Sequence, residues 1–250
     1  SKKKKKWYYE GGLRYDLKIY DVATISKSLP RSVERFNPLF HNVNALLGGS
    51  YMLTPKMKIN LSTGFVQRAP EVNELYSNGL HQGVSGIEQG YRELKSETSI
   101  KTLLTTDYKI RDHLYFQGVA YIQNIENYIY LQGQDSFQLT IRGAYPLFHY
   151  KQTNAVLKGA DLALSYEWKE KLKVVGKYSM VKGKDVSRDL PLINIPSSMF
   201  RFNVKYSFEN KKFIQGAYIQ AGLKHVLQQD EILEEQDFLA PPEGYTLVDV

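Results

Sequence analysis

The chain has 250 residues, with 33 Lys and Arg against 26 Asp and Glu, a formal net charge of +7. This length suits one large domain or part of a larger one. Cysteine is absent, which excludes a disulfide framework and a cysteine metal site. No stretch approaches the roughly 18 uninterrupted apolar residues of a membrane-spanning helix, so helical spanning is excluded.

Part of the positive charge lies in a lysine run at 2–6. Such a run can attract nucleic acid or anionic lipid, but runs of like charge are usually solvated turns or chain ends. The rest of the chain is close to balanced, so we expect no nucleic-acid partner.

The predicted elements are strands, starting with 7–19, where apolar and polar residues alternate. The same alternation occurs at 57–65, 172–180 and 199–208. In the last segment Phe200, Phe202, Val204, Tyr206 and Phe208 alternate with Arg201, Asn203, Lys205 and Ser207. Because successive side chains of a strand point to opposite faces, each segment separates an apolar environment from a polar one.

Noisier strands follow at 97–108, 111–124, 155–168 and 212–225, and we count ten strands in all. Many of them reach about ten residues, longer than the five or six of ordinary globular strands. A tilted strand needs about nine to eleven residues to cross a bilayer. The lengths therefore favour a membrane barrel over a soluble sandwich.

Tight turns and long connections strictly alternate along the chain. Tight turns are predicted at 54–56, 109–112, 169–171 and 210–212, and long connections at 21–38, 67–96, 125–153, 183–196 and 226–244. An outer-membrane barrel has this rhythm, with short periplasmic turns and longer extracellular loops. A compact soluble domain favours short connections throughout.

Aromatic residues gather near the tight turns, where they would form a girdle at one membrane interface. These residues are Trp7, Tyr8, Tyr9, Tyr51, Tyr108, Tyr115, Tyr166, Trp168, Tyr206, Phe208 and Phe213. A general preference of aromatic residues for strands explains their number but not their position. We therefore predict an all-β fold, an antiparallel transmembrane β-barrel fragment.

Both ends of the chain look truncated, because no signal sequence opens it and the strand at 245–250 is still running at Val250. If Leu13, Leu61, Val174 and Phe202 were buried against a second sheet, the alternative of a soluble all-β binding domain would hold instead.

The segment GFVQRAPEVNELYSNG at 64–79, continued by EQG at 88–90 and LKSET at 94–98, resembles the strand-to-loop motif of TonB-dependent outer-membrane receptors. Weaker similarities lie at 11–16, 154–161 and 190–196, so the resemblance touches most of the chain. It implies that 1–250 is a partial receptor barrel, about ten strands from the second half of a barrel of about 22 strands. It also implies an N-terminal plug domain with an energy-coupling box, neither of which is present here.

The resemblance implies active uptake of a scarce nutrient across the outer membrane of a Gram-negative bacterium, energised through TonB. We expect an iron chelate, such as a siderophore, as the ligand, and outer-membrane lipid around the barrel. Haem, cobalamin, metals and sugars are carried on the same scaffold, and the fold does not decide among them. A passive or structural barrel, such as a porin or adhesin, shares the loop rhythm but does not explain the 64–98 segment.

We expect no enzyme, no catalytic residue and no cofactor. No Gly-rich phosphate loop, nucleophile elbow or paired-histidine metal motif appears. Glu71 and Glu74 are three residues apart, but nothing supplies a partner base or nucleophile, so they are better interpreted as scattered loop acids.

For ligand binding, the candidate residues lie in two long loops. They are Arg68, Asn73, Tyr76 and His81 in the first loop, and Arg142, Tyr145 and His149 in the second. A guanidinium fork and tyrosines suit a bulky anionic chelate, whereas a bare transition metal would favour His81, Glu88 and His149. In the alternative interpretation, Arg68 and Pro70 fix the exit of the loop, and His149 and Tyr150 are ordinary loop residues.

Overall fold

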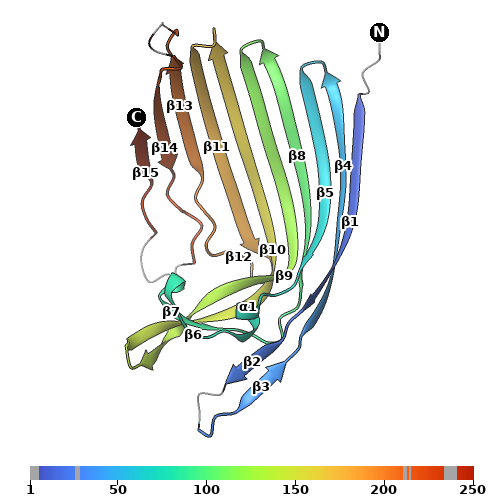
Figure 1. Ribbon diagram of the computed structural model, residues 1–250, viewed down its shortest axis with the longest axis vertical. Helices are drawn as coiled ribbons and strands as arrows, with labels where there is room; N and C mark the ends of the chain where they lie inside the picture. Colours follow the sequence, from blue (N-terminus) through green and yellow to red (C-terminus); the bar gives the residue numbers. More distant parts are fainter. Residues whose placement is uncertain (1–5, 26–28, 211–212, 214, 234–240) are drawn as a thin grey trace.

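The computed structural model describes residues 6–25, 29–210, 213, 215–233 and 241–250. Its main element is one antiparallel sheet in which ten strands follow one another in chain order, curved into an arc (Figure 1). They are β1 (Trp7–Ile19), β4 (Leu39–Thr54), β5 (Met57–Arg68), β8 (Glu97–Arg111), β9 (Leu114–Thr140), β10 (Gly143–Trp168), β11 (Leu172–Asp185), β13 (Met199–Ser207), β14 (Tyr218–Val226) and β15 (Tyr245–Asp249). The predicted count of ten strands is confirmed. The sheet does not close, and β1 and β15 form its two edges.

Short turns and long connections lie at opposite ends of the sheet (Figure 1). Turns at Pro55, Asp112 and Lys169 confirm three of the predicted tight turns. The fourth, at 210–212, includes residues 211 and 212, which lie outside the described residues. Lys169 and Glu170 both have positive φ, of 48° and 57°, as in the primed turns whose twist matches that of paired strands.

The connections at the other end contain short elements of their own. The first long connection holds the hairpin of β2 (Val22–Ile25) and β3 (Val33–Phe36). The second holds α1 (Val72–Tyr76), β6 (Asn78–His81), the 3₁₀ turn η1 (Gln82–Val84) and β7 (Gly86–Gln89), and the fourth holds β12 (Leu190–Pro191). In the described part of the chain, no helix is long and apolar enough to cross a membrane.

The prediction of a loop at 125–153 is wrong, because most of this segment is strand. β9 runs on to Thr140 and β10 starts at Gly143, and the two strands pair as a long hairpin beyond the point where β8 begins. Runs such as Tyr128, Ile129 and Tyr130 favour strand, and each strand of the hairpin satisfies the backbone groups of the other.

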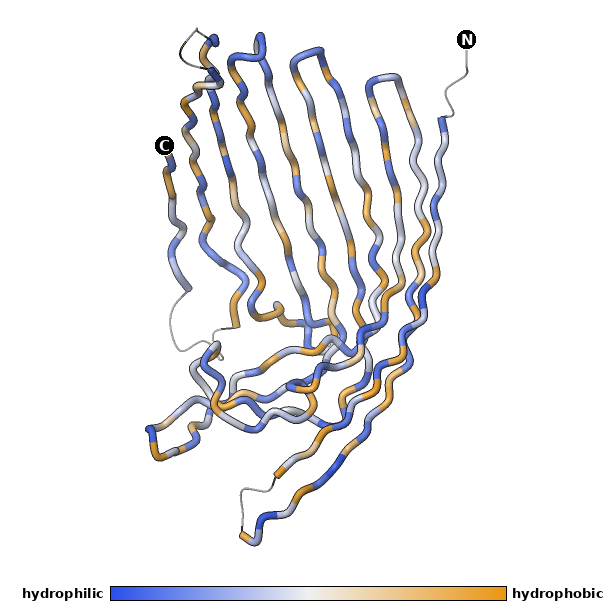
Figure 2. The backbone as a smooth tube through the Cα atoms, viewed as in Figure 1, coloured by the Kyte–Doolittle hydropathy of each residue, from blue (hydrophilic) through white to orange (hydrophobic). Residues whose placement is uncertain are grey.

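Hydrophobic and hydrophilic residues alternate along many of the strands (Figure 2), and the two faces of the sheet differ accordingly. Leu13, Leu61 and Phe202 share one face and are 80%, 54% and 48% exposed, and in the described part of the chain no second sheet covers them. We call this side the apolar face and the opposite one the polar face. A soluble sandwich would have buried these side chains, so the membrane interpretation is the one the structure supports.

Most of the predicted aromatic girdle lies on the apolar face near the tight turns. The rings of Trp7 and Tyr51 pack 4.2 Å apart, and Tyr108 pairs directly with Phe116. Tyr115 does not belong to the girdle, because it pairs with Lys109 and Ser165 on the polar face. The same holds for Tyr8, which pairs with Ser50. An offset of one residue along a strand reverses the face.

The buried core lies at the long-loop end, beneath the loops rather than between two sheets. One cluster joins Leu75, Leu94 and Ile129, with Tyr76 and Tyr150 packed against it. A second joins Ile125, Ala155 and Leu192. The loops of this end therefore form a packed layer on the sheet.

Replacing Leu61 by Arg places a charge in the middle of the apolar face. In a bilayer we expect Leu61→Arg to destabilise the full-length protein by about 2–4 kcal/mol, measured by denaturant unfolding in lipid vesicles. Ser62→Arg is the matched control on the polar face and should change stability much less. Equal losses for both variants would contradict the assignment of the faces.

Candidate functional site

The packed loop layer starts where β5 ends, at an ion-pair node. Arg68 Nε donates a 2.6 Å hydrogen bond to Glu97, and Arg68 Nη1 donates to the Glu74 carboxylate at 3.0 and 3.1 Å. The second oxygen of Glu97 accepts from the backbone N–H of Ile129. The node thus ties the end of β5 to α1, to the start of β8 and to the β9–β10 hairpin.

This geometry determines how Arg68 can act. Both carboxylates of the node are largely buried, with side chains 13% and 14% exposed for Glu74 and Glu97, and the guanidinium is already engaged by them. An Arg held by two carboxylates has little charge left for an anionic ligand. The contacts of Arg68 therefore favour the interpretation that it fixes the exit of the loop over the interpretation that it contacts a ligand.

Helix α1 is positioned by backbone contacts from both sides. The Glu71 backbone N–H donates to Glu74 at its first turn, and Tyr20 donates from its hydroxyl to the Pro70 carbonyl at 2.7 Å. On the other side Gly90 donates its N–H to the Ser77 carbonyl at 2.8 Å. A Cβ at Gly90 would lie 2.5 Å from the backbone of Leu75 and Tyr76, so only glycine fits there.

Beside α1 lies an open hollow of about 910 Å³ between the helix and the β2–β3 hairpin. Its lining includes Asn73, Tyr76, Asn78, Glu34 and Arg92. Helix α1 and the β2–β3 hairpin, which line it, lie at the end of the sheet remote from the tight turns (Figure 1). We call it the loop pocket.

Two residues that line the loop pocket, Tyr76 and Arg92, pack against Phe36, which lies outside the lining. The Phe36 and Tyr76 rings stack 5.3 Å apart, and the Arg92 guanidinium lies 4.2 Å from the Phe36 centroid. Among the described residues, its one carboxylate partner is Glu34, at 3.4 Å, and both side chains are more than half exposed. Such an exposed pair is weak, so the guanidinium keeps donors for a ligand.

Asn73 and His81 belong to a second chain of contacts. Asn73 donates its amide to the Tyr150 hydroxyl at 3.1 Å, and that hydroxyl donates to Glu88 at 3.3 Å. His81 Nδ1 lies 3.0 Å from the other oxygen of Glu88. Glu88 is buried. The pKa of the Tyr150 hydroxyl is raised, mainly because Tyr150 itself is partly buried.

His149 lies in the β9–β10 hairpin next to β7, where it pairs with Gln89. Its Nε2 is buried without a hydrogen-bond partner in the described structure, and burial lowers its pKa. Nowhere in the described part do three or more His, Asp or Glu side chains gather in a way that could hold a metal ion. Of the three residues that a bare metal would favour, His81 and Glu88 lie next to each other, 3.0 Å apart.

Arg142 and Tyr145 are not brought to this cluster. Arg142 lies exposed at the turn of the β9–β10 hairpin, and Tyr145 pairs with Gln138 near the same end. About seven residues of extended chain separate Arg142 from His149, or about 23 Å. The second predicted cluster is thus spread along the hairpin.

Sequence reasoning missed Phe36 and Arg92. They come from two different connections and meet Tyr76 only because the β2–β3 hairpin folds against α1. No local motif marks either residue.

The family described as TonB dependent receptor-like, beta-barrel matches residues 3–250. The chain belongs to this family. No curated protein matches its sequence. Proteins of the family are transporter receptors of the outer membrane of Gram-negative bacteria, rather than enzymes, and that membrane is the location of this one.

Solved structures show the same fold. The copper transporter OprC is 17% identical with a TM-score of 0.74, over 98% of this chain and 36% of its own. The FrpB iron transporter from Neisseria meningitidis (F3-3 variant) is 15% identical with a TM-score of 0.63, over 98% and 36%. The siderophore receptor PirA from Acinetobacter baumannii is 13% identical with a TM-score of 0.61, over 86% and 35%. The chain thus spans about a third of the length of these proteins.

Gly90 offers a test of how the loop layer is held. We expect Gly90→Ala to cost about 1–3 kcal/mol by overpacking against the backbone of α1, and to speed hydrogen exchange of the amides at 72–91. Gly79→Ala is the matched control, because a Cβ there meets nothing within 4 Å. If exchange at 72–91 rises equally in both variants, the close contact at Gly90 does not hold α1 in place.

Proposed function

We propose that this chain is part of an outer-membrane receptor that captures an iron chelate in the loop pocket. The observation that carries the proposal is the stack of Arg92, Phe36 and Tyr76 beside Asn73. Flat aromatic rings bury apolar parts of a ligand, and a guanidinium binds carboxylate, phosphate or phenolate oxygens with paired donors.

The proposed roles differ among the predicted residues. Tyr76 and Asn73 line the pocket, with Tyr76 in the stack and Asn73 at the end of the Tyr150 and Glu88 chain. His81 positions Glu88 from the far side of that chain. The exposed Arg142 and the half-buried Tyr145, on the protruding hairpin, would meet an approaching ligand before it reaches the pocket.

Helix α1 is tied to three strands by the Arg68 node. Ligand contacts on Tyr76 would therefore be transmitted to the end of β5 and to the start of β8. A packed layer of this kind tends to have two discrete arrangements rather than to deform continuously. This suits a receptor in which ligand binding at the loops must change contacts elsewhere in the protein.

We propose that energy comes from TonB through a plug domain outside this chain, with 1–250 forming part of the barrel wall. The chain's share of the length of its solved neighbours, about a third, supports this division. The neighbours described as an iron transporter and a siderophore receptor favour iron, whereas OprC is described as a copper transporter. A panel of ligands is therefore needed.

The test uses the full-length protein in detergent, titrated calorimetrically with ferric citrate, a ferric catecholate, a ferric hydroxamate and free cupric ion. We expect at least one ferric chelate to bind and Arg92→Gln to weaken it about tenfold or more, because a charged hydrogen bond contributes about 1.5–3 kcal/mol.

Lys95→Gln is the matched control, since Lys95 is a cation of the same loop outside the pocket lining. Binding of cupric ion alone, or of no ferric chelate, would rule out the iron preference. Equal weakening by both variants would rule out the loop pocket.

A further inference from the structure

Three exposed lysines lie on the apolar face of the sheet, among side chains that meet lipid. They are Lys158 on β10 and Lys182 and Lys184 on β11, and we call them the outer lysine cluster. The register fixes their face, because one row of paired residues crosses the sheet through Leu61, Leu104, Ala120, Ala160 and Met180. Lys158 and Lys182 are the next pair along the same face. Charges on this face need an explanation, since most of it is apolar.

The cluster lies at the level of a membrane interface. Trp168 belongs to the aromatic girdle on the same face of β10, and ten residues of extended strand, about 33 Å, separate it from Lys158. For a strand tilted by about 40° this gives a height of about 25 Å, which is the height of the apolar band of an outer-membrane barrel. The lysines therefore lie where hydrocarbon gives way to lipid headgroups.

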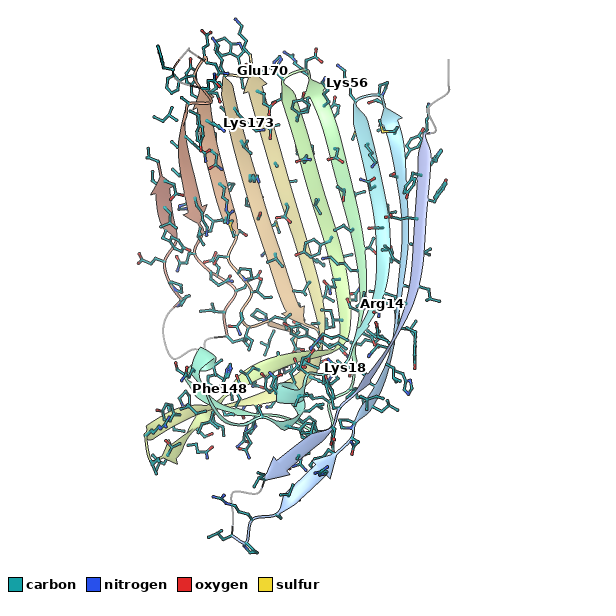
Figure 3. All side chains as sticks on the ribbon, in the orientation of Figure 1. Arg14, Lys18, Lys56, Phe148, Glu170 and Lys173 are labelled. Atoms are coloured by element: carbon teal, nitrogen blue, oxygen red, sulfur yellow. The ribbon has the colours of Figure 1, made fainter. Side chains whose placement is uncertain are left out.

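This interface is the one on the side of the long loops. Figure 3 shows Lys56 and Glu170 at the tight-turn end of the sheet, and Lys18 and Phe148 at the loop end. Tight turns of an outer-membrane barrel are periplasmic and long loops are extracellular. The cluster therefore faces the outer leaflet, at a depth where a lysine on the lipid face costs little stability.

The neighbouring strands carry no charge at this level of the apolar face. Lys158 pairs with Ile122 on β9, Ile122 with Thr102 on β8, and Thr102 with Thr63 on β5. The positive charge is therefore a local feature of β10 and β11 and does not continue along the sheet towards β1.

The contacts within the cluster leave it able to bind an anion. Lys158 and Lys182 are directly opposite each other, on strands about 4.8 Å apart, and like charges in this position destabilise a sheet. Lys182 pairs with Glu231 and Lys184 with Asp189, each at 2.5 Å, and both lysines are more than half exposed. In the described part of the chain, Lys158 forms no ion pair. Exposed pairs are weak, so another anion can displace the two acids.

A hollow of about 650 Å³ adjoins the cluster. Besides the three lysines, its lining holds Asp189, Asp230 and Glu231 from the loops and the apolar side chains of Val156, Val186, Pro191 and Ile232. Cations beside apolar walls suit a ligand that carries both a charged group and hydrocarbon. An inorganic anion would use the cations alone.

Parts of the receptor outside this chain leave the cluster uncovered. The plug domain proposed above would lie inside the barrel, on the polar face. Further strands would continue the sheet from β1 and β15, whereas β10 and β11 lie in the middle of it. The surroundings of the outer lysine cluster are therefore the membrane.

We infer that the outer lysine cluster binds the phosphorylated headgroup of an outer-leaflet lipid. Ammonium groups donate hydrogen bonds to phosphate oxygens, and lysines near a membrane surface attract anionic lipids. The acyl chains would then lie along the apolar face of β10 and β11, over Leu162 and Tyr178. The site is separate from the loop pocket, because it lies outside the barrel wall.

The test measures binding to the full-length protein in detergent by native mass spectrometry. The probes are a glucosamine lipid with two phosphates (lipid A), phosphatidylcholine and inorganic phosphate. We expect lipid A to bind more tightly than the other two, and the triple variant Lys158→Gln, Lys182→Gln, Lys184→Gln to bind it at least tenfold more weakly. Equal binding of phosphatidylcholine, or of inorganic phosphate, would overturn the inference.

Two further variants control for charge and for folding. Lys56→Gln, Lys109→Gln, Lys169→Gln removes the same charge from the tight turns and should leave lipid A binding unchanged. Arginine at all three positions of the cluster keeps the charge and should keep the binding. Equal loss in the two glutamine variants, or loss in the arginine variant, would contradict the proposed site.

The loop acids separate lipid binding from a purely structural role of the ion pairs. Asp189 has a positive φ of 61°, which asparagine also adopts, so Asp189→Asn with Glu231→Gln removes both competing carboxylates without straining the backbone. We expect this double variant to bind lipid A severalfold more tightly. A lower melting temperature with unchanged lipid affinity would mean that the lysines only hold the loops, and the inference would fail.

This inference and the proposed function can fail independently. Arg92→Gln should weaken chelate capture and leave lipid A binding intact, and the glutamine variant of the cluster should do the reverse. If no ferric chelate binds but lipid A still binds at the cluster, the proposed function fails and the lipid site stands.

Discussion

The structure depends on one constraint, the pairing of every backbone N–H and C=O within a sheet whose side chains alternate between lipid and a polar interior. Hydrocarbon offers no hydrogen-bond partner, so a spanning strand must be paired on both sides. Once pairing is fixed, the period of two assigns every side chain to a face. Leu61 and Ser62 are neighbours in the chain, yet they meet opposite environments.

The same constraint confines the irregular and varied backbone to the long connections at one end of the sheet. Tight turns such as Lys169 and Glu170 are too short to fold on one another, whereas the long connections can. They do so around Leu75, Leu94 and Ile129, and the Arg68 node anchors that layer to three strands. The loop pocket is a consequence of this packing, because α1 and the β2–β3 hairpin that lies against it form its lining.

The cations of the polar face differ in whether an acidic side chain lies opposite them. Where a cation faces an acid, as Lys58 faces Asp107, the wall is neutral and needs no further partner. Where cations face cations, across β11, β13 and β14, the described part of the chain forms no ion pair with Lys177, Arg201 or Lys224.

The sequence by itself determined the ten strands, their faces and the three described tight turns, because alternation and turn residues are local signals. It also carried the family motif at 64–98. It could not determine that 125–153 pairs as a hairpin. Strand formation there depends on the pairing of β9 with β10 and not on the local polarity of the segment. Nor could it show that Arg68 is engaged by Glu74 and Glu97, or that Arg92 reaches Phe36 and Tyr76. Those contacts join segments far apart in the chain, and only the tertiary fold brings them within reach of one another.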